Sequence, residues 1–413
     1  MMLALFLLLA ADAEPGASDW PMFRGPKRDN LSPDKGLLKT WPKDGPKLLW
    51  KAEGAGVGFS SVVVSAGRVF TMGTSDGKTF IHAWDAKKGG KPLWSAEVGK
   101  GGRENYEGTR CTPAVSDGLV YGLSAYGDFA CVTADKGETK WAKNLGKDFG
   151  GSSGGWQYSE SPLVDGKRVI VTPGGSKALM AALDKKTGEE AWRTAGGDAS
   201  GSAGYSSAVV SHGGGVKQYV QLVGKGTIGV RASDGKLLWR YDAFSDNTAN
   251  VPTPIVLGDK VLTAAGYGKA ASLLALSKDG DGVKFKEEWT EGQLRNKHGG
   301  VLVAGDRMFG DTDDGGRPYA AEWKTGKTLW RRGREGKGGG SASLTWADGM
   351  LYIRYQDGWM ALVPATGDKY VEKSGFRIPG VRRESWSHPV VIGGRLYLRE
   401  DDAILCYDVK KGE

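Results

Sequence analysis

Side chains that could bind a ligand or do chemistry recur at comparable positions along this sequence, each beside a short Ser/Thr-containing segment. The set mixes charged, amide, imidazole and aromatic groups: Arg110, Glu160, Tyr205, Asn250, His298, Trp386 and His388. Such a mixture suits ligand binding by hydrogen bonds and ring stacking, and a histidine among them could act as a general base. No two of them form a contiguous motif, so the fold must bring them together.

Local motifs give little support for a familiar reaction centre. Residues 224–229 (GKGTIG) match the dinucleotide fingerprint, but they run into a strand, a turn and a tryptophan instead of a helix that could receive a phosphate. We therefore predict a hairpin there. Residues 150–154 (GGSSG) match a nucleophile-elbow pattern without a following helix, and no two of the four histidines have the spacing of a zinc site.

Two acidic turns are the remaining metal candidates. Asp279 and Asp281 lie in KDGDG, and Asp311, Asp313 and Asp314 form a second group. Carboxylates are good calcium ligands, but neither spacing is that of an EF-hand loop. We expect both turns to be solvated and predict no metal ligands.

A repeat organises most of the chain. Segments ending in a large residue recur every 41 to 51 residues, which is the length of a propeller blade: GPKLLW50, GKPLW94, GETKW141, GEEAW192, GKLLW239, FKEEW289, GKTLW330 and, with valine in the tryptophan position, GDKYV371. Each tryptophan is expected to cover the gap to the next blade, with its indole N–H on a backbone acceptor. These residues are therefore structural and not site candidates.

Two further elements repeat in register with the tryptophans. A strand, a tight turn and a strand precede most of them, and the turn carries a glycine for which we predict positive φ: Gly137, Gly188, Gly235, Gly326 and Gly367. A tripeptide opens each blade: Ser60-Ser61-Val62, Cys111-Thr112-Pro113, Glu160-Ser161-Pro162, Ser206-Ser207-Ala208, Pro252-Thr253-Pro254, Ala342-Ser343-Leu344, Ser387-His388-Pro389 and, in the remaining blade, the segment His298-Gly299-Gly300-Val301.

These elements predict an all-β, eight-bladed β-propeller over residues 47–413, with four antiparallel strands per blade. The last repeat ends before its outer strand, and the strand around Trp50 lacks inner strands of its own. We expect this N-terminal strand to complete the final blade and close the ring. The seven candidate residues would then surround the central funnel, where ligands bind most propellers.

The N-terminus indicates export. Residues 1–11 are apolar but too short to span a bilayer, and Ala11-Asp12-Ala13 fits a signal-peptidase site, although no Lys or Arg precedes the apolar run. We predict a signal peptide at 1–13, an N-terminal extension at 14–46 and a periplasmic or secreted protein with no transmembrane segment. The three cysteines (Cys111, Cys131 and Cys406) are expected to be buried thiols.

The motif ALDKKTGEEAW (182–192) and its relatives resemble the tryptophan-docking repeat of propellers named for pyrroloquinoline quinone (PQQ), and this resemblance covers residues 47–413. DWPMFRGP (19–26), HGGV (298–301) and HPVVIGGRLYLR (388–399) look like a group of secreted bacterial PQQ-like proteins. Relatives with assigned roles are the quinoprotein alcohol dehydrogenases and the non-catalytic scaffold of outer-membrane protein assembly. The dehydrogenases resemble one another in two adjacent cysteines, a calcium ion and an Asp base; this chain lacks the cysteine pair. The scaffold carries a lipid-acceptor cysteine that is also missing.

The resemblance therefore leaves two main functions open. The first is an exported, non-catalytic binding or scaffold propeller, which we expect to be a monomer with a protein or carbohydrate partner in the cell envelope. The alternative is a PQQ-dependent dehydrogenase of alcohols or sugars, with PQQ and calcium as cofactors, Glu160 and Asn250 as their contacts, and His298 or His388 as the base. A weaker third possibility is an anionic-polysaccharide binder, since the net charge is +8. Export argues against a nucleic-acid partner.

Overall fold

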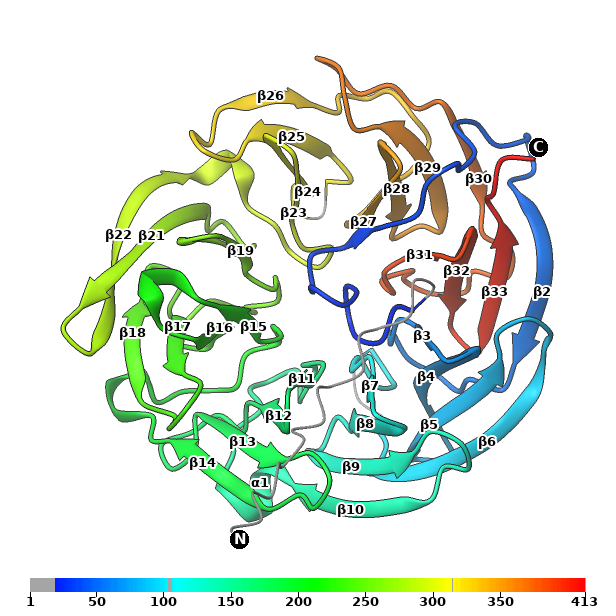
Figure 1. The fold of residues 1–413 in the computed structure, drawn as a ribbon. Coiled ribbons are helices and arrows are strands. Elements are labelled where there is room, and N and C mark those ends of the chain that lie inside the picture. Colours follow the sequence, from blue (N-terminus) through cyan, green and yellow to red (C-terminus); the bar gives the residue numbers. More distant parts are fainter. Residues whose placement is uncertain (1–18, 103–105, 314, 413) are drawn as a thin grey trace, which may run out of the picture.

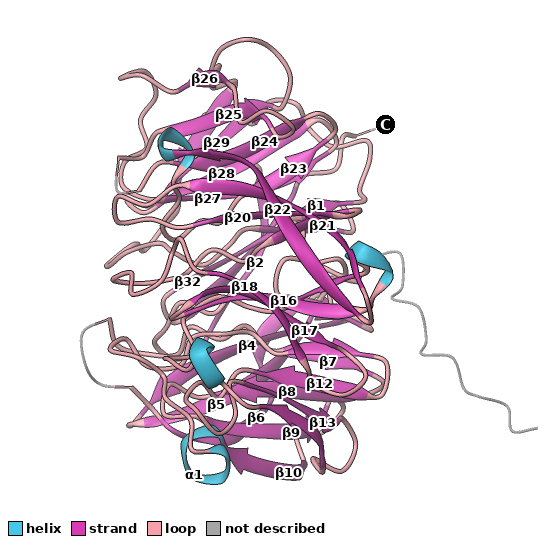
Figure 2. Cartoon of the chain, turned by 90° about the vertical axis from the view of Figure 1, so that its left-hand side faces the viewer, coloured by secondary structure: helices cyan, strands magenta, loops and turns pink. Residues whose placement is uncertain are grey.

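The computed structural model describes residues 19–102, 106–313 and 315–412. Within these residues the strands form eight sheets around one axis, seven with four strands and one with five. Figure 1 looks along this axis, and Figure 2 shows the ring from the side as a disk. The predicted eight-bladed, all-β propeller with antiparallel four-stranded blades is confirmed.

Each blade runs from the axis to the rim. The strands of blades 1 to 4 are β3 (Val63–Ser65), β4 (Arg68–Ser75), β5 (Lys78–Asp85) and β6 (Gly89–Lys100); β7 (Ala114–Ser116), β8 (Leu119–Leu123), β9 (Asp128–Thr133) and β10 (Thr139–Asn144); β11 (Leu163–Asp165), β12 (Arg168–Val171), β13 (Met180–Asp184) and β14 (Glu190–Thr194); β15 (Val209–Ser211), β16 (Gln218–Val223), β17 (Gly226–Arg231) and β18 (Leu237–Tyr241). The predicted hairpin at the glycine-rich motif is thus the β16–β17 turn.

Blades 5 to 7 continue this pattern. Their strands are β19 (Ile255–Leu257), β20 (Lys260–Ala264), β21 (Ala271–Asp279) and β22 (Gly282–Glu291); β23 (Leu302–Ala304), β24 (Arg307–Asp311), β25 (Pro318–Glu322) and β26 (Thr328–Arg331); β27 (Ala342–Ala347), β28 (Met350–Tyr355), β29 (Trp359–Pro364) and β30 (Ser374–Arg377). Short helices lie in the loops of the described chain: α1 (Leu145–Phe149) and the 3₁₀ turns η1 (Gly197–Ala199), η2 (Gly213–Gly215) and η3 (Gly292–Leu294).

Blade 8 joins the two ends of the chain. Its inner strands are β31 (Val390–Ile392), β32 (Arg395–Glu400) and β33 (Ala403–Asp408), and its outer strand is β2 (Lys47–Glu53). Strand β2 runs antiparallel to β33, with Lys47 opposite Asp408. The predicted closure by the N-terminal strand is confirmed.

The repeated tryptophans connect neighbouring blades as predicted. The indole N–H of Trp141 donates to the Lys185 carbonyl over 3.1 Å, and those of Trp50, Trp94, Trp192 and Trp289 reach a carbonyl of the next blade over 3.1 to 3.2 Å. Blades 4 and 6 differ. Trp239 donates to the side chain of Gln218 in its own blade, and the indole N–H of Trp330 has no partner among the described residues.

Four of the five predicted turn glycines lie under these rings, and Gly367 does not. Each glycine predicted to have positive φ does so, at +73° to +102°. A Cβ on Gly235 would lie 2.5 Å from the ring of Trp192, so the position needs glycine for both its conformation and its space. Blade 7 is the exception, because Val371 is exposed and lies before the outer strand β30, whose Phe376 packs its ring on Tyr407 of blade 8 at 5.2 Å. Val371 therefore does not occupy the tryptophan position that was assigned to it.

Other predictions about isolated residues have mixed outcomes. The three cysteines are buried and unbridged, as predicted, and burial raises the pKa of each thiol to about 12. At the KDGDG turn, Asp281 is exposed and pairs with Arg231 and Lys236. The second acidic group is not a solvated turn, because Asp311 is buried and burial raises its pKa to about 8.

The predicted signal peptide at 1–13 lies outside the described residues. The part of the chain that the structure covers contains no helix that is both long and apolar enough to cross a membrane.

Candidate functional site

A cavity of about 430 Å³ lies on the propeller axis, at the end where the inner strands begin. Its walls are largely aromatic. The rings come from the N-terminal segment and from the connections that enter the blades: Phe23, Phe59, Tyr106, Trp156, Tyr205, Tyr267 and Trp386, with His298 and His388 beside them. Its lining among the described residues includes Arg24, Arg110 and Lys297 but no carboxylate.

The cavity is built from two positions of the blade-opening repeat. In six of the eight blades the residue before the tripeptide contributes to an upper ring, and His298, the first residue of its segment, takes the same place: Phe59, Arg110, Ser159, Tyr205, Val251, His298 and Trp386. The residue two positions later, which is the middle residue of the tripeptides, contributes to a lower ring: Ser61, Thr112, Ser161, Ser207, Thr253, Gly300 and His388. Side chains two residues apart on an extended chain point to the same side, which explains why both rings face the axis.

Five of the seven predicted site residues line this cavity: Arg110, Tyr205, His298, Trp386 and His388. Glu160 and Asn250 do not. Both stand one position away from a cavity-lining residue, Ser161 and Val251 respectively, and a shift of one residue along an extended segment turns a side chain to the other face. Whether the five that line the cavity bind a ligand remains a prediction.

Glu160 has a structural role that recurs in neighbouring blades. One carboxylate oxygen accepts a hydrogen bond from the backbone N–H of Thr172, directly after β12, and the other accepts one from the Gln221 amide over 3.3 Å. Ser60 and Cys111, at the same place in the repeat, accept the equivalent backbone N–H from their own second strands. Burial raises the pKa of Glu160 to about 7.

Asn250 is also committed to the protein. Its amide nitrogen donates to the carbonyls of Val223, at 2.7 Å, and Phe244, at 3.0 Å. Its oxygen accepts from Asn247 over 3.1 Å. The side chain therefore holds the loop after β18 against blade 4 and is directed into the protein instead of the cavity.

Trp386 is the centre of the aromatic wall. Its ring centroid lies 4.4 Å from that of His298, 4.9 Å from that of Tyr106 and 5.0 Å from that of Phe59. Its indole N–H donates to Gln356 over 3.0 Å. Trp156 extends the wall through Tyr106, at 6.0 Å, and is one of the exposed large hydrophobic residues of the described chain. The wall offers flat carbon surfaces to an incoming ring.

His388 is unsuited to base catalysis. Asn30 donates to its Nδ1 over 3.0 Å, the other side of the ring is hydrogen-bonded to the His298 backbone, and burial together with the charge of Arg24 lowers its pKa to about 3. A general base works best with a pKa near the operating pH. The histidine therefore supports the floor of the cavity, which removes one of the two residues proposed as a dehydrogenase base.

The hydroxyls of the lower ring link adjacent blades. Backbone N–H groups donate to them in sequence: His388 to the Ser61 hydroxyl over 2.7 Å, Ser61 to Thr112 over 2.9 Å, Thr112 to Ser161 over 3.0 Å and Ser161 to Ser207 over 2.9 Å. Each bond crosses from one blade to the next at the axis. This is the physical reason for the recurring Ser or Thr in the tripeptides.

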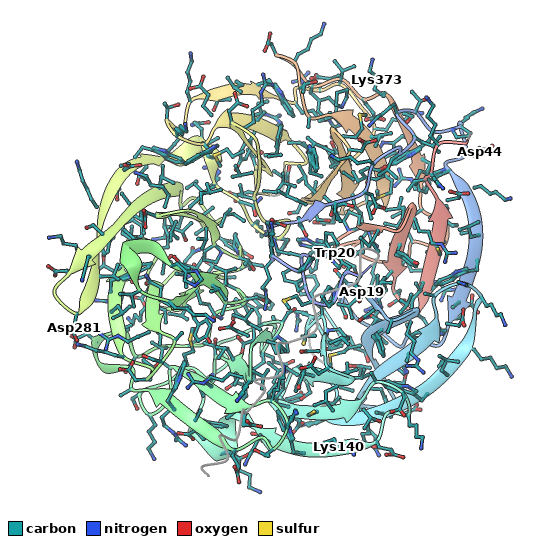
Figure 3. All side chains as sticks on the ribbon, viewed as in Figure 1. Asp19, Trp20, Asp44, Lys140, Asp281 and Lys373 are labelled. Carbon is teal, nitrogen blue, oxygen red and sulfur yellow. The ribbon has the colours of Figure 1, made fainter. Side chains whose placement is uncertain are left out.

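The N-terminal segment, residues 19–38, passes along the axis and closes the cavity from below. Figure 1 shows this segment in dark blue at the middle of the ring, and Figure 3 places Trp20 near the centre while Lys140 and Asp281 lie at the rim. Trp20 pairs with Val64 of blade 1 through two backbone hydrogen bonds, and β1 (Leu31–Ser32) runs parallel to β27 of blade 7. The segment thus contacts blades on both sides of the axis.

Buried polar side chains fix this segment. Arg28 donates to the carbonyls of Ser161, at 2.7 Å, and Pro162, at 3.1 Å, and Asn30 donates to the Leu344 carbonyl over 2.9 Å. Arg24, Arg28 and Asn30 all have positive φ, at 66°, 56° and 60°. Non-glycine residues rarely adopt this conformation, so three of them in seven residues show that the surrounding contacts hold the backbone in place. We call residues 19–38 the axial plug. The plug could not be predicted from the sequence because it contains no repeat.

Comparison with known proteins places the propeller in a family. The family model described as "Outer membrane protein assembly factor BamB" matches residues 81–332, which is more than half of the chain. The chain belongs to this family. The matched residues run from β5 in blade 1 to the end of β26 in blade 6.

Curated relatives match parts of the chain. The outer membrane protein assembly factor BamB of Salmonella typhimurium is 32% identical over 106 residues, covering 25% of each chain. The BamB of Shewanella oneidensis is 24% identical over 259 residues, 58% of this chain and 60% of that protein. The matches thus span less than two thirds of these relatives.

Solved structures share the fold. The quinohemoprotein alcohol dehydrogenase of Comamonas testosteroni superposes with a TM-score of 0.69 at 13% identity, over 97% of this chain and 82% of that one. A europium-containing methanol dehydrogenase gives a TM-score of 0.64 at 12% identity, over 93% and 89%. At these identities the likeness concerns the propeller alone.

The described residues do not fit PQQ held by calcium, the cofactor pair of the dehydrogenase alternative considered from the sequence. Glu160 and Asn250, the oxygen-bearing candidates, direct their side chains into protein contacts. The described lining of the cavity has no carboxylate, and no group of three or more potential metal-ligating His, Cys, Asp or Glu side chains occurs in the part of the chain that the structure describes. We therefore derive no reaction that involves a quinone at this cavity.

Proposed function

We propose that this chain is a non-catalytic binding propeller of the cell envelope, which holds a ligand or a segment of a protein partner in the central cavity. The observation that carries the proposal is the cavity itself: an aromatic cup closed below by the N-terminal segment, whose nearby histidine and carboxylate, His388 and Glu160, are both engaged in structural hydrogen bonds. A pocket with ring surfaces and few reactive groups suits recognition better than turnover.

Family membership supports the location and the scaffold role. The curated relatives are named as outer membrane protein assembly factors, which implies partners in the cell envelope. The apolar N-terminus with its Ala-x-Ala site agrees with export. We accordingly propose a periplasmic or secreted protein.

The test is capture of partners from envelope extract by the full chain, with cavity and rim variants compared. Trp386→Ala and Trp156→Ala remove the upper wall, whereas Lys140→Ala changes an exposed rim residue. We expect the two cavity variants to lose a partner that the wild type and Lys140→Ala retain. Equal capture by all four proteins would contradict a role for the cavity.

An enzymatic role is tested separately. Calorimetric titration with PQQ in the presence and absence of Ca²⁺, followed by alcohol and sugar oxidation with a dye acceptor, should show no Ca²⁺-dependent binding and no turnover. Robust PQQ-dependent turnover would overturn the proposal in favour of a dehydrogenase.

A further inference from the structure

The floor of the cavity contains a buried arginine with unused hydrogen-bonding capacity. Arg24 lines the cavity, yet its side chain is almost fully buried, at 2% exposure. One guanidinium nitrogen, Nη2, donates to the Val301 carbonyl, while Nε is buried without a partner and Nη1 makes no hydrogen bond within the described chain. Nη1 lies against Gly300, where a Cβ would come within 2.4 Å of it. Glycine is needed there to leave room for the guanidinium.

The hydroxyls of the lower ring add further donors. Those of Ser61, Thr112, Ser161 and Ser207 each accept a backbone N–H from the neighbouring blade, as described above. A hydroxyl has one hydrogen to donate, and none of the four donates it to a described residue. All four are buried and line the cavity, so their O–H groups are available to a ligand in it.

The charge at this floor is positive. Burial lowers the pKa of Arg24 to about 10 and that of Arg28 to about 9, and the charge of Arg24 adds to the lowering at Arg28. The carboxylates that oppose these shifts, Asp29 and Glu160, do not line the cavity. Arg110 and Lys297 lie higher on the wall. Cations and O–H donors gathered without a lining carboxylate favour an anionic group on the floor.

The walls indicate what is attached to that anion. A sugar would present hydroxyls that need acceptors, whereas the upper wall consists mainly of the rings of Phe59, Tyr106 and Trp386 and the aliphatic groups of Val251 and Pro252. Such surfaces favour an apolar body, and a flat ring above all. This argues against the carbohydrate partner considered from the sequence.

We propose that the cavity binds the carboxylate of an apolar, ring-bearing acid, with the carboxylate on Arg24 and the Ser/Thr hydroxyls and the ring against Trp386. This rests on the proposed binding function and specifies its ligand class. The chemistry has two sources, a small aryl acid or the C-terminal aromatic residue of a polypeptide, and both present the same two groups.

The test uses ligands that differ only in charge. Wild-type full-length protein is titrated by calorimetry with N-acetyl-L-phenylalanine and with its uncharged amide. We expect the acid to bind at least about tenfold more tightly, because the amide lacks the charge-assisted hydrogen bonds. Equal affinities, or no binding of the acid at millimolar concentration, would overturn the proposal without any variant. Glucuronate tests the ring requirement, and binding as tight as that of the acid would also overturn it.

Variants then locate the two halves of the ligand. Arg24→Gln should remove most of the preference for the acid over the amide, while Trp386→Leu should lower the affinity for both ligands. Arg334→Gln, at an exposed arginine outside the cavity, is the matched charge control and should change neither. An Arg24→Gln protein that folds and keeps the full preference would place the anion elsewhere.

Two further titrations distinguish the two sources of the carboxylate, small acids and polypeptide C-termini. Indole-3-acetate represents the small acids, and a hexapeptide ending in phenylalanine, with a free or an amidated C-terminus, represents polypeptides. Tighter binding of the free-acid peptide than of indole-3-acetate assigns the site to polypeptide C-termini, and the reverse order assigns it to small acids. If the wild type binds none of these acids but still captures a partner in a cavity-dependent way, this ligand class is rejected and the proposed function stands.

Discussion

At the rim of the ring each blade meets the next through a contact that repeats, whereas at the axis the blades meet a segment that occurs once. The rim contact is apolar and local: Trp192 lies on Gly235 and donates one hydrogen bond to Ala232. The axial contact is polar and long-range, with Arg28 and Asn30 donating to carbonyls of blades 3 and 7.

The difference separates stability from specificity. Repeated rim contacts can each be replaced by a similar one, as Phe376 shows in blade 7, where its ring packs on Tyr407 of blade 8. The axial segment instead concentrates buried charge, left-handed backbone and the cavity in one place, a combination typical of binding sites. Mutations at the rim and at the axis should therefore have different consequences.

The largest expected effect is at the rim. Trp192→Ala removes a buried indole and its hydrogen bond and should lower the free energy of unfolding by about 4 kcal/mol. Trp156→Ala, in the cavity wall, should cost about 1 kcal/mol or less because that side chain is exposed. Chemical denaturation followed by circular dichroism measures both. Similar losses for the two variants would remove the distinction between rim and axis.

The next effect is a pair of opposite pH dependences at the axis. Burial raises the pKa of Glu160 from 4.5 to about 7, so its contribution to stability is present below pH 4.5 and is lost as the pH rises to 7. Burial lowers the pKa of His388 from 6.5 to about 3, so its contribution is present above pH 6.5 and is lost as the pH falls.

Two variants measure these slopes by urea unfolding between pH 4.5 and 7. Relative to Glu160→Gln, the wild type should lose about 3 kcal/mol as the pH rises across this range. Relative to His388→Gln, it should gain about 3 kcal/mol from pH 4.5 to 6.5. Slopes of the same sign for both variants would contradict the two pKa shifts.

A smaller effect is expected where the plug is anchored. Arg28→Met keeps the apolar stem but removes the buried guanidinium and the two hydrogen bonds that it donates. The free energy of unfolding should fall by about 2 kcal/mol. Limited proteolysis should then cut first between residues 19 and 38, with the blades intact. The exposed Arg334→Met is the control and should match the wild type. Simultaneous cleavage of blades and plug would show that the axis supports the ring as a whole.

The smallest effect compares two rim tryptophans. Trp141→Phe loses the hydrogen bond to Lys185 and should cost about 1 kcal/mol more than Trp330→Phe, whose indole N–H has no described partner to lose. Thermal unfolding of both variants under one condition is sufficient. A larger loss at Trp330 would mean that ring packing, and not the hydrogen bond, dominates the rim contact.

What could be predicted from the sequence follows the same division. The blades and the glycine conformations were predictable because their physical requirements leave a mark at successive repeats, and the ring closure was predictable because the last repeat lacks the outer strand that the N-terminus supplies. The position of Arg110 and Tyr205 in the cavity lining was predictable from the repeat in the same way. The prediction that Glu160 faces the funnel differs from the structure because the pattern marks the opening tripeptide but not which of its residues face the axis. A shift of one position turns a side chain to the other face.

The floor of the cavity could not be predicted in this way. Phe23 and Arg24 come from a segment without periodicity, and their place depends on contacts with blades far away in sequence. Tyr106 and Trp156 likewise lie in single-copy loops. Nothing local distinguishes them from solvent-exposed aromatic residues.

The final blade has a consequence for how the protein reaches its folded state. Strand β2 is made early, but its partner β33 follows roughly 350 residues later, and the ring cannot close before then. Contacts this distant in sequence form slowly, so blades 1 to 7 must wait with an open edge while the last one is completed. We therefore expect ring closure to be the slow step of maturation, and a carboxylate-bearing ligand on Arg24 to favour the closed state only once that step is over.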